Sequence, residues 1–380
     1  MNYRSKLPDI ETTIFTIMSQ LAAEHKAINL AQGFPDFACS RQLVDLAKKY
    51  AHHGWNQYAP MPGVLPLREK IAEKTSDLYQ YSPDPDSEIT ITCGATEACY
   101  TAISAFIGQG DEVIIFEPAF DSYAPAVRLQ GGVPVFIELS YPCFDISWDE
   151  VKHRISPKTR MIVINSPHNP TGSILRQSDV EALEELVRGT DILILSDEVY
   201  EHVVFDGAEH ISLLGYDSLR DRLLSIFSFG KTFHTTGWRV GYCVARAPLM
   251  KEFRKVHQYI TFAAPTPLQY AIADFLENKE AYRSLPAFYQ TKRDHFIGLM
   301  QSSRFTCAPS AGTYFQLFSY KSVSDMPDTE MAEWLTREAG VATIPISVFY
   351  RSGRDDKVLR FCFAKETVTL EKAAERLCRI

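Results

Sequence analysis

Five short stretches of this sequence hold side chains that could do chemistry, and the first is SFGKTFHTTGWRVGY, which contains Lys231. The apolar run LLSIFSF before it predicts a buried strand. A lysine desolvated at the end of such a strand has a lowered pKa, which suits imine chemistry with a carbonyl group. Ser228 and Arg239 flank the lysine and could bind an anion beside it. His234, in the same stretch, has no predicted role beyond local structure.

The letters GKT in this stretch raise a competing interpretation, a nucleotide-binding phosphate loop. That motif requires a glycine six residues before the lysine, and this chain has Ser225 at that position. The residues after Lys231 are also unlike the start of an amphipathic helix. The sequence therefore disfavours a phosphate-loop nucleotidase.

Two further stretches are turns that follow predicted strands. In TITCGATEA, small residues precede a helix start, with Thr96 and Glu97 as capping candidates. The turn is either a simple capped turn or an anion cradle of free N–H groups. In MIVINSPHNPTG, Asn169 either shapes a β-turn together with its proline and glycine neighbours or donates its amide to a ligand oxygen.

The last two stretches place charges beside apolar runs. Asp197 follows ILILS directly, so it is either solvated or, if buried, in need of a cation or a protonated nitrogen. Tyr200 could offer its hydroxyl to the same ligand. Arg360 lies within VLRFCFA and must bind a carboxylate, either in a structural salt bridge, which spacing alone favours, or from a substrate.

The elements that must position these groups alternate short apolar runs with helical patterns from about residue 88 onward. This alternation predicts a doubly wound α/β domain with a mostly parallel seven-stranded sheet, over residues 43–276. Residues 277–380 predict a smaller α+β domain with strands GTYFQLF, VATIPISVF and VLRFCFA. Residues 1–42 predict an N-terminal arm that crosses between domains and joins the smaller one.

Composition excludes several classes of protein. With 46% hydrophobic and 23% charged residues, the 380-residue chain has the profile of a globular enzyme. A net charge of −8 disfavours nucleic acid and anionic membranes as partners. The eight cysteines form no Cys-x-x-Cys pair, and no histidine has metal-ligand spacing, so no metal site is expected. The absence of a signal-peptide pattern and of long apolar runs leads us to expect a cytoplasmic location.

Taken in order, GATEA, NSPHNPTG, SDEVYEH and SFGKTFHTTGWRVGY resemble the motifs of fold-type I, class I and II aminotransferases. The resemblance covers essentially the whole chain, including INLAQGFPDF and VLRFCFAK. It is strongest to the kynurenine and glutamine-transaminase-like subgroup that includes bacterial methionine aminotransferases. It implies the cofactor pyridoxal 5′-phosphate and a homodimer.

The resemblance also implies a role for each candidate residue. Lys231 would form the Schiff base and move the substrate proton, Asp197 would pair with the pyridine nitrogen, and Tyr200 would complete the catalytic set. Cofactor binding would involve Gly94, Ala95, Thr96, Phe120, Asn169, Asp197, Tyr200, Ser228, Lys231, Arg239 and, across the dimer interface, Tyr58. Substrate binding would involve Phe15, Gly33, Asn169 and Arg360.

Two departures from the kynurenine-type pattern bear on substrate. Phe15 replaces a tryptophan of those relatives, and Ala263 replaces a histidine. The sequence shows no clear second arginine that would bind the side-chain carboxylate of a dicarboxylic substrate such as aspartate. We therefore expect a ping-pong aminotransferase that takes methionine and other apolar or aromatic amino acids. The alternatives are a kynurenine or glutamine transaminase with cysteine-S-conjugate β-lyase side activity and, with the least support, a non-catalytic cofactor-binding sensor.

Overall fold

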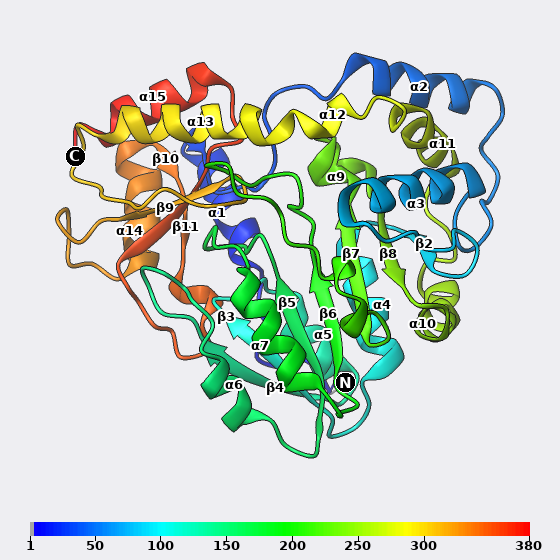
Figure 1. Ribbon diagram of the computed structural model, residues 1–380. Helices are drawn as coiled ribbons and strands as arrows, with labels where there is room; N and C mark the ends of the chain where they lie inside the picture. The colour runs from blue at the N-terminus through cyan, green and yellow to red at the C-terminus, as the bar shows by residue number, and fades with distance from the viewer. Residues whose placement is uncertain (1–3) are drawn as a thin grey trace.

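The computed structural model describes residues 4–380, and its centre is a seven-stranded mixed sheet (Figure 1). The strand order is β2-β8-β7-β6-β5-β3-β4, in which β8 runs antiparallel to both neighbours and the other pairs are parallel. These strands are β2 Ile89–Thr92, β3 Glu112–Glu117, β4 Val133–Glu138, β5 Thr159–Asn165, β6 Leu193–Asp197, β7 Leu223–Ser228 and β8 Gly241–Ala245. The predicted fold class is confirmed.

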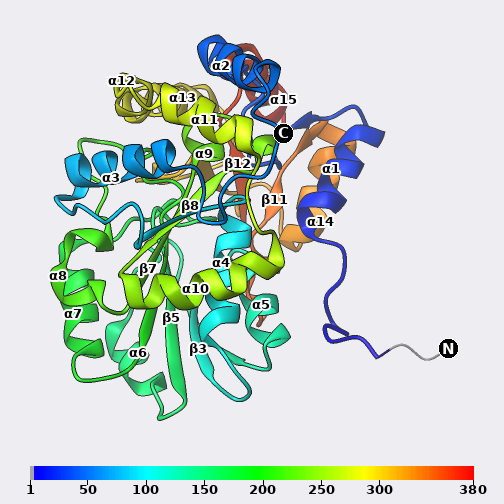
Figure 2. The ribbon, with the colours of Figure 1, turned by 90° about the vertical axis from the view of Figure 1, so that its right-hand side faces the viewer.

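Helices cover both faces of this sheet. Figure 2 shows α4, α5 and α10 on one face and α6, α7 and α8 on the other. The helices are α1 Ile14–Glu24, α2 Arg41–His52, α3 Leu65–Tyr79, α4 Ala95–Phe106, α5 Tyr123–Leu129, α6 Trp148–Arg154, α7 Gln177–Val187, α8 Asp217–Arg220, α9 Phe229–Thr232, α10 Ala247–Ile260, α11 Thr266–Phe275, α12 Glu280–Arg283, α13 Leu285–Met300, α14 Asp328–Trp334 and α15 Thr367–Leu377. Because successive strand residues point to opposite faces, Ile194 joins one apolar core and Leu195 the other. Because both faces of the sheet are buried, its strands have continuous apolar sequences instead of alternating ones.

A second, smaller set of strands lies to one side, under α13 and α15 (Figure 1). It comprises β1 Ile28–Asn29, β9 Phe315–Ser319, β10 Val341–Ala342, β11 Ile344–Pro345 and β12 Val358–Cys362. The prediction of one strand over VATIPISVF is wrong. The chain pairs with β1 at β10, turns, pairs with β12 at β11 and then forms a short helical turn, Ser347–Phe349. Pro345 is the last residue of β11, and it has no N–H with which to extend this ladder.

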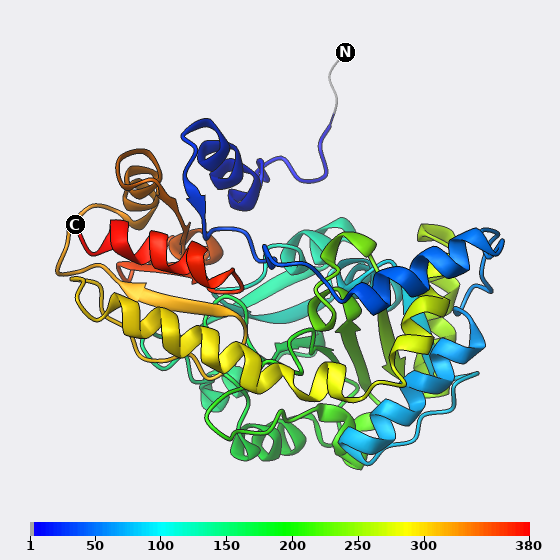
Figure 3. The same ribbon diagram turned by 90° about the horizontal axis from the view of Figure 1, so that it is seen from above.

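The N-terminal segment does more than cross between domains. β1 pairs in parallel with β10, and α1 buries Met18, Leu21 and Ala22 beside it. Figure 2 shows α1 beside α14, and Figure 3 shows the segment after β1 running across the molecule to α2. Residues 1–3 of the predicted arm lie outside the described residues. The domain boundaries at residues 42 and 276 stay predictions.

Residues 4–380 contain neither a candidate membrane span nor a candidate metal-binding cluster. No helix there is long and apolar enough to cross a membrane. Nor does that range hold a group of three or more histidine, cysteine or acidic residues arranged to bind a metal ion.

Candidate active site

Parallel strands of the large sheet end side by side, and their last residues begin the site. Asn165, at the end of β5, pairs in register with Asp197, at the end of β6. β7 lies next to β6 and ends at Ser228, which α9 follows directly. In open α/β sheets the carboxyl edge is where ligands bind. The fold therefore brings Asp197 and Ser228, which the sequence singled out, to one edge of the sheet, beside Asn165, which it did not.

Lys231 lies within α9 with its amine enclosed. Its Nζ donates to the Tyr314 hydroxyl at 2.9 Å and to the Gly33 carbonyl at 3.1 Å. Burial lowers the pKa of Lys231 to about 8. Ser225 lies inside β7, so no loop precedes the lysine that could wrap a nucleotide phosphate. The geometry therefore fits an amine that is easily made neutral and nucleophilic.

Asp197 is buried, so the alternative of a solvated strand end is wrong. One carboxylate oxygen accepts a hydrogen bond from the Tyr123 hydroxyl, and the other accepts from the Val199 N–H at 3.3 Å. Asn165 fixes the backbone by donating to the Asp197 carbonyl at 2.9 Å. Burial raises the pKa of Asp197 to about 6.

Arg360 lies in β12 and is only 1% exposed. Its two terminal nitrogens donate to the Asn169 side-chain oxygen at 2.7 Å and to the Ala31 carbonyl at 2.9 Å. The guanidinium lies 3.9 Å from the Phe315 ring centroid, and its buried Nε has no hydrogen-bond partner within residues 4–380. Burial lowers the pKa of Arg360 to about 10. Among the described residues, Arg360 does not form the structural salt bridge that spacing favours.

A cradle for an anion forms where α4 begins. Gly94 adopts φ +82°, and a Cβ there would meet the Arg239 guanidinium at 2.7 Å. A Cβ on Gly241 would come within 3.0 Å of the Ala95 nitrogen, and Gly241 pairs with Ser228 across the sheet. Glycine is thus required on both sides of this cradle. The first N–H groups of α4, the Arg239 guanidinium and Ser228 converge there, although the exposed Thr96 side chain makes no contact with it that the structure shows.

The aromatic candidates lie at different depths. Phe120 is half-buried, with its ring 5.8 Å from that of Tyr123. Tyr200 is buried, with its ring centroid 5.5 Å from the Lys231 amine. Phe15 lies 5.1 Å from the Arg360 guanidinium. Gly33 has no room for a side chain, because a Cβ would lie 2.8 Å from Phe315.

Tyr58 differs from the other candidates. It is 87% exposed and lies edge-on to Phe262, with ring centroids 5.6 Å apart. Within one chain it is a surface residue.

The charges at this site have no protein counterpart. Asp197, Lys231, Arg239 and Arg360 form no ion pair with any other residue in the range 4–380. Asp197 and Arg360 are buried, and a buried unpaired charge costs several kcal/mol as an order of magnitude. Such a set fits a ligand that brings a carbonyl, a protonatable nitrogen and two anionic groups. An amino acid together with a phosphorylated pyridine aldehyde has these groups.

His234 has a local structural role. It follows α9 with φ +58°, a conformation that histidine adopts more often than most residues. The N–H of Thr235 bonds to the Gly230 carbonyl at 3.0 Å, which closes the end of the helix. Aromatic rings of Phe37 and Tyr289 pack around the imidazole.

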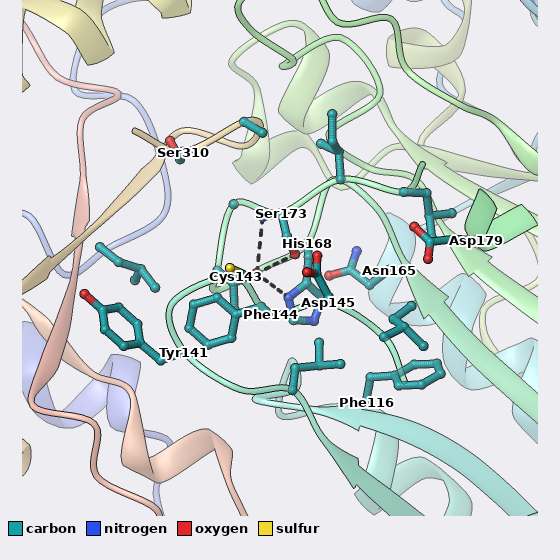
Figure 4. Close-up of a pocket in the computed structure, with 18 of the residues that line it drawn as sticks. Phe116, Tyr141, Cys143, Phe144, Asp145, Asn165, His168, Ser173, Asp179 and Ser310 are labelled. Carbon is teal, nitrogen blue, oxygen red and sulfur yellow. Dashed lines mark hydrogen bonds between the residues drawn. The ribbon is translucent and has the colours of Figure 1, made fainter. Parts of the chain in front are cut away.

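A cavity of about 500 Å³ lies behind the site (Figure 4). It shares Tyr123 and Asn165 with the surroundings of Asp197, but Lys231 and Arg360 are not in its walls. His168 borders it with Nδ1 bonded to the Thr171 hydroxyl at 2.7 Å, and burial lowers the pKa of His168 to about 4. The cavity is mostly apolar and separate from the reactive amine.

Sequence reasoning missed three groups in the site. Tyr123 and Tyr314 bond to Asp197 and Lys231, and the Ala31 carbonyl bonds to Arg360. Tyr123 follows Phe120 by three residues, so its position after a strand was a usable signal. Tyr314 is 83 residues from Lys231, and no local pattern links the two.

Comparison with known proteins agrees with this geometry. The family model for aminotransferase class I and II matches residues 25–377. Methionine aminotransferase from Escherichia coli is 51% identical over 375 residues, which are 98% of this chain and 97% of that protein. The crystal structure of Escherichia coli YbdL, which identified a methionine aminotransferase function, superposes with a TM-score of 0.97 at 50% identity over all of both chains.

A more distant relative is kynurenine–oxoglutarate transaminase 1 of Mus musculus. It is 33% identical over 408 residues, covering 98% of this chain and 96% of the relative. The resemblance read from the motifs is thus confirmed over nearly the full length. This chain belongs to the class I and II aminotransferases.

Proposed function

We propose that this aminotransferase moves the amino group of methionine, and of other apolar or aromatic amino acids, to a 2-oxo acid. The observation that carries the proposal is a set of charges with no ion-pair partner among residues 4–380: the buried Asp197 and Arg360, close to the partly buried amine of Lys231. The methionine preference is supported by the 51% identity to the Escherichia coli methionine aminotransferase.

The cofactor that these residues suit is pyridoxal 5′-phosphate. When bound, it supplies a carbonyl for the amine and a ring that withdraws electrons from the substrate carbon. Asp197 would hold a proton on the ring nitrogen, and Asn169 and Tyr200 would donate to the ring hydroxyl oxygen. Phe120 would stack on the ring. The Gly94–Thr96 N–H groups, Ser228 and Arg239 would hold the phosphate, since a helix start beside a guanidinium favours an anion.

Lys231 would do the proton transfer. Its amine, with a pKa of about 8, can release and accept a proton near neutral pH. Burial excludes water from the neighbourhood of the amine, which keeps competing hydrolysis out of the site. Lys231 would thus carry the proton between the substrate Cα and the cofactor.

Arg360 would bind the substrate α-carboxylate, helped by Asn169 and Gly33. The aromatic rings of Phe15 and Phe315 lie on the guanidinium, and Phe349 packs 5.7 Å from Phe15. A substrate whose carboxylate reaches Arg360 thus has an apolar neighbourhood for its side chain. This surrounding favours methionine over aspartate.

Replacing Arg360 by lysine is expected to lower kcat/KM about 30- to 100-fold, mainly through a higher KM. Lysine keeps the charge, but it cannot hold Asn169, the Ala31 carbonyl and a carboxylate at once. Steady-state kinetics with methionine measure the effect. Arg304, an exposed arginine that bonds to the C-terminal carbonyl, provides the matched control R304K. Equal losses in both variants would contradict the assignment of the carboxylate to Arg360.

The substrate proposal is tested by comparing kcat/KM for methionine, phenylalanine, kynurenine, glutamine and aspartate. We expect methionine to exceed aspartate by at least about 10-fold, since the rings of Phe15, Phe315 and Phe349 near Arg360 offer no partner for a second carboxylate. An aspartate preference would contradict the proposal. Pyruvate released from a cysteine S-conjugate without added oxo acid would support the β-lyase alternative.

The homodimer is part of this proposal. Exposed aromatic and aliphatic side chains gather on two neighbouring stretches, near Tyr58 and near Phe262. They are Trp55, Tyr58, Leu65, Tyr259, Ile260 and Phe262. Exposed apolar groups in such number are typical of protein–protein contacts. In the dimer, Tyr58 of each chain would reach the phosphate of the other. The cytoplasmic location, expected because the sequence shows no signal-peptide pattern and no long apolar run, also belongs to the proposal.

A further inference from the structure

A buried tyrosine hydroxyl touches the reactive amine. Tyr314 is 0% exposed, and its hydroxyl lies 2.9 Å from Lys231 Nζ. The same hydroxyl lies 2.6 Å from the Gly33 carbonyl, which is itself 3.1 Å from Nζ. The three polar atoms thus form a closed triangle, to which the N-terminal segment, α9 and the chain before β9 contribute one atom each.

The direction of each hydrogen bond in this triangle follows from the donors available. The Gly33 carbonyl has no hydrogen, so the Tyr314 hydroxyl donates its single hydrogen to it. The hydroxyl oxygen then accepts from Lys231, as the carbonyl does. Both protein partners of Nζ are therefore acceptors.

This arrangement fixes where the lone pair of the amine points. A neutral primary amine has two N–H groups and one lone pair in a tetrahedral arrangement. When Tyr314 and Gly33 take both N–H groups, the lone pair must point away from both. In the ammonium form, the third N–H takes the same direction. Proton uptake and release by Lys231 thus occur along one line.

The backbone before Tyr314 is held in an uncommon conformation. Thr313 has φ +64°, which is rare and energetically costly for a β-branched residue. Its N–H bonds to the Val203 carbonyl at 2.9 Å, and the N–H of Gly312 bonds to the Gly172 carbonyl at 2.8 Å. The Phe363 N–H bonds to the Tyr314 carbonyl at 3.0 Å. These contacts hold Tyr314 in place against that cost.

We propose that Tyr314 is a positioning residue of transamination, which together with the Gly33 carbonyl holds the free amine of Lys231 and aims its lone pair at the substrate Cα. The inference rests on the proposed role of Lys231. It assigns the Tyr314 hydroxyl a part in the reaction. Removing the hydroxyl should therefore slow the proton transfer while leaving substrate binding nearly intact.

Tyr314→Phe is the test, and Tyr289→Phe is its matched control. Tyr289 is equally buried, its ring lies 5.7 Å from that of Tyr314, and its hydroxyl has no partner within residues 4–380. In the holoenzyme, Tyr314→Phe should lower kcat about 10- to 100-fold with KM within about 3-fold. The isotope effect of α-deuterated methionine on kcat should rise, because proton transfer becomes slower than the other steps. Tyr289→Phe should change neither.

A second measurement does not depend on activity. In the full chain before cofactor is added, the pH dependence of Lys231 modification by an amine reagent gives the pKa of Lys231. Losing one of the two acceptors of its ammonium form should move that pKa from about 8 to about 7. Tyr289→Phe should leave it unchanged.

The outcomes separate this inference from the proposed function. Wild-type kinetics, isotope effect and Lys231 pKa in Tyr314→Phe would overturn the inference while Lys231 remains essential. Equal changes in Tyr289→Phe would overturn it too, since the cause would then be packing. A Lys231→Ala variant that still transaminates would instead overturn the proposed function.

Discussion

Replacing Lys231 by alanine is expected to lower the rate of transamination by at least about 10⁴-fold, because one side chain serves as both nucleophile and base. No other amine takes its place, since among residues 4–380 the Lys231 Nζ alone is shown bonded to Gly33 and Tyr314. The folded structure should survive, because the lost hydrogen bonds leave Tyr314 still donating to the Gly33 carbonyl.

Two measurements check this prediction. Single-turnover absorbance after adding methionine gives the rate, and borohydride reduction followed by peptide mass analysis shows whether the cofactor is fixed to residue 231. Burial also lowers the pKa of Lys292, whose amine donates to the Lys365 carbonyl at 2.8 Å. Lys292→Ala therefore serves as the control and should keep kcat within a few-fold. A Lys231→Ala variant with more than a tenth of wild-type kcat would contradict the prediction.

Replacing Asp197 by asparagine is expected to lower kcat about 10²- to 10³-fold. Asparagine can still accept the hydrogen bond from Tyr123, so the shape of the site is kept. The negative charge that would hold a proton on the ring nitrogen is lost. The loss should therefore appear in kcat, with little change in KM for methionine.

The same substitution is expected to stabilise the full chain before cofactor is added. The pKa of Asp197 is about 6 in the folded state against 3.8 for an ordinary aspartate, so the folded state binds the proton more tightly. Stability of the wild type then falls as pH rises from about 4 to about 6 and stays low above that. Asparagine removes this loss, which is about 3 kcal/mol at pH 8, since one pKa unit corresponds to about 1.4 kcal/mol.

Urea unfolding at pH 4.5 and pH 8 measures the effect. The gain from Asp197→Asn should be larger at pH 8 than at pH 4.5. Asp328, which bonds to Ser347 and whose pKa burial also raises, provides the control Asp328→Asn, which should retain kcat. A variant that loses stability at pH 8 would show that Asp197 is held by favourable interactions before the cofactor binds.

Much of the site was predictable because its residues follow buried strands. Asp197 and Ser228 come directly after apolar runs, and Asn169 follows such a run by four residues. Strand order and the parallel direction of β5, β6 and β7 then bring their ends to one edge. The local sequence pattern was enough to identify these residues, since the parallel sheet places the ends of its strands close together.

The remaining features depend on contacts that no local pattern records. Arg360 is bonded to Ala31 across 329 residues of sequence, which spacing could not distinguish from a salt bridge. The division of 341–349 between two sheets also depends on distant partners, β1 for one half and β12 for the other. Such features follow from tertiary pairing and not from the residues' own preferences.

The triangle of hydrogen bonds around the Lys231 amine has a consequence for how the enzyme folds during its synthesis. Gly33 lies 198 residues before Lys231, Tyr314 lies 83 residues after it, and β12 comes later still. On the ribosome, the large sheet can form while the N-terminal segment still lacks β10 and β12, the strands that hold it near the site. The N-terminal segment therefore lacks its strand partners until most of the chain has been synthesised. A nascent chain that stops short of Arg360 would carry the lysine but have no means of gripping a substrate, so activity arrives only with the last strand.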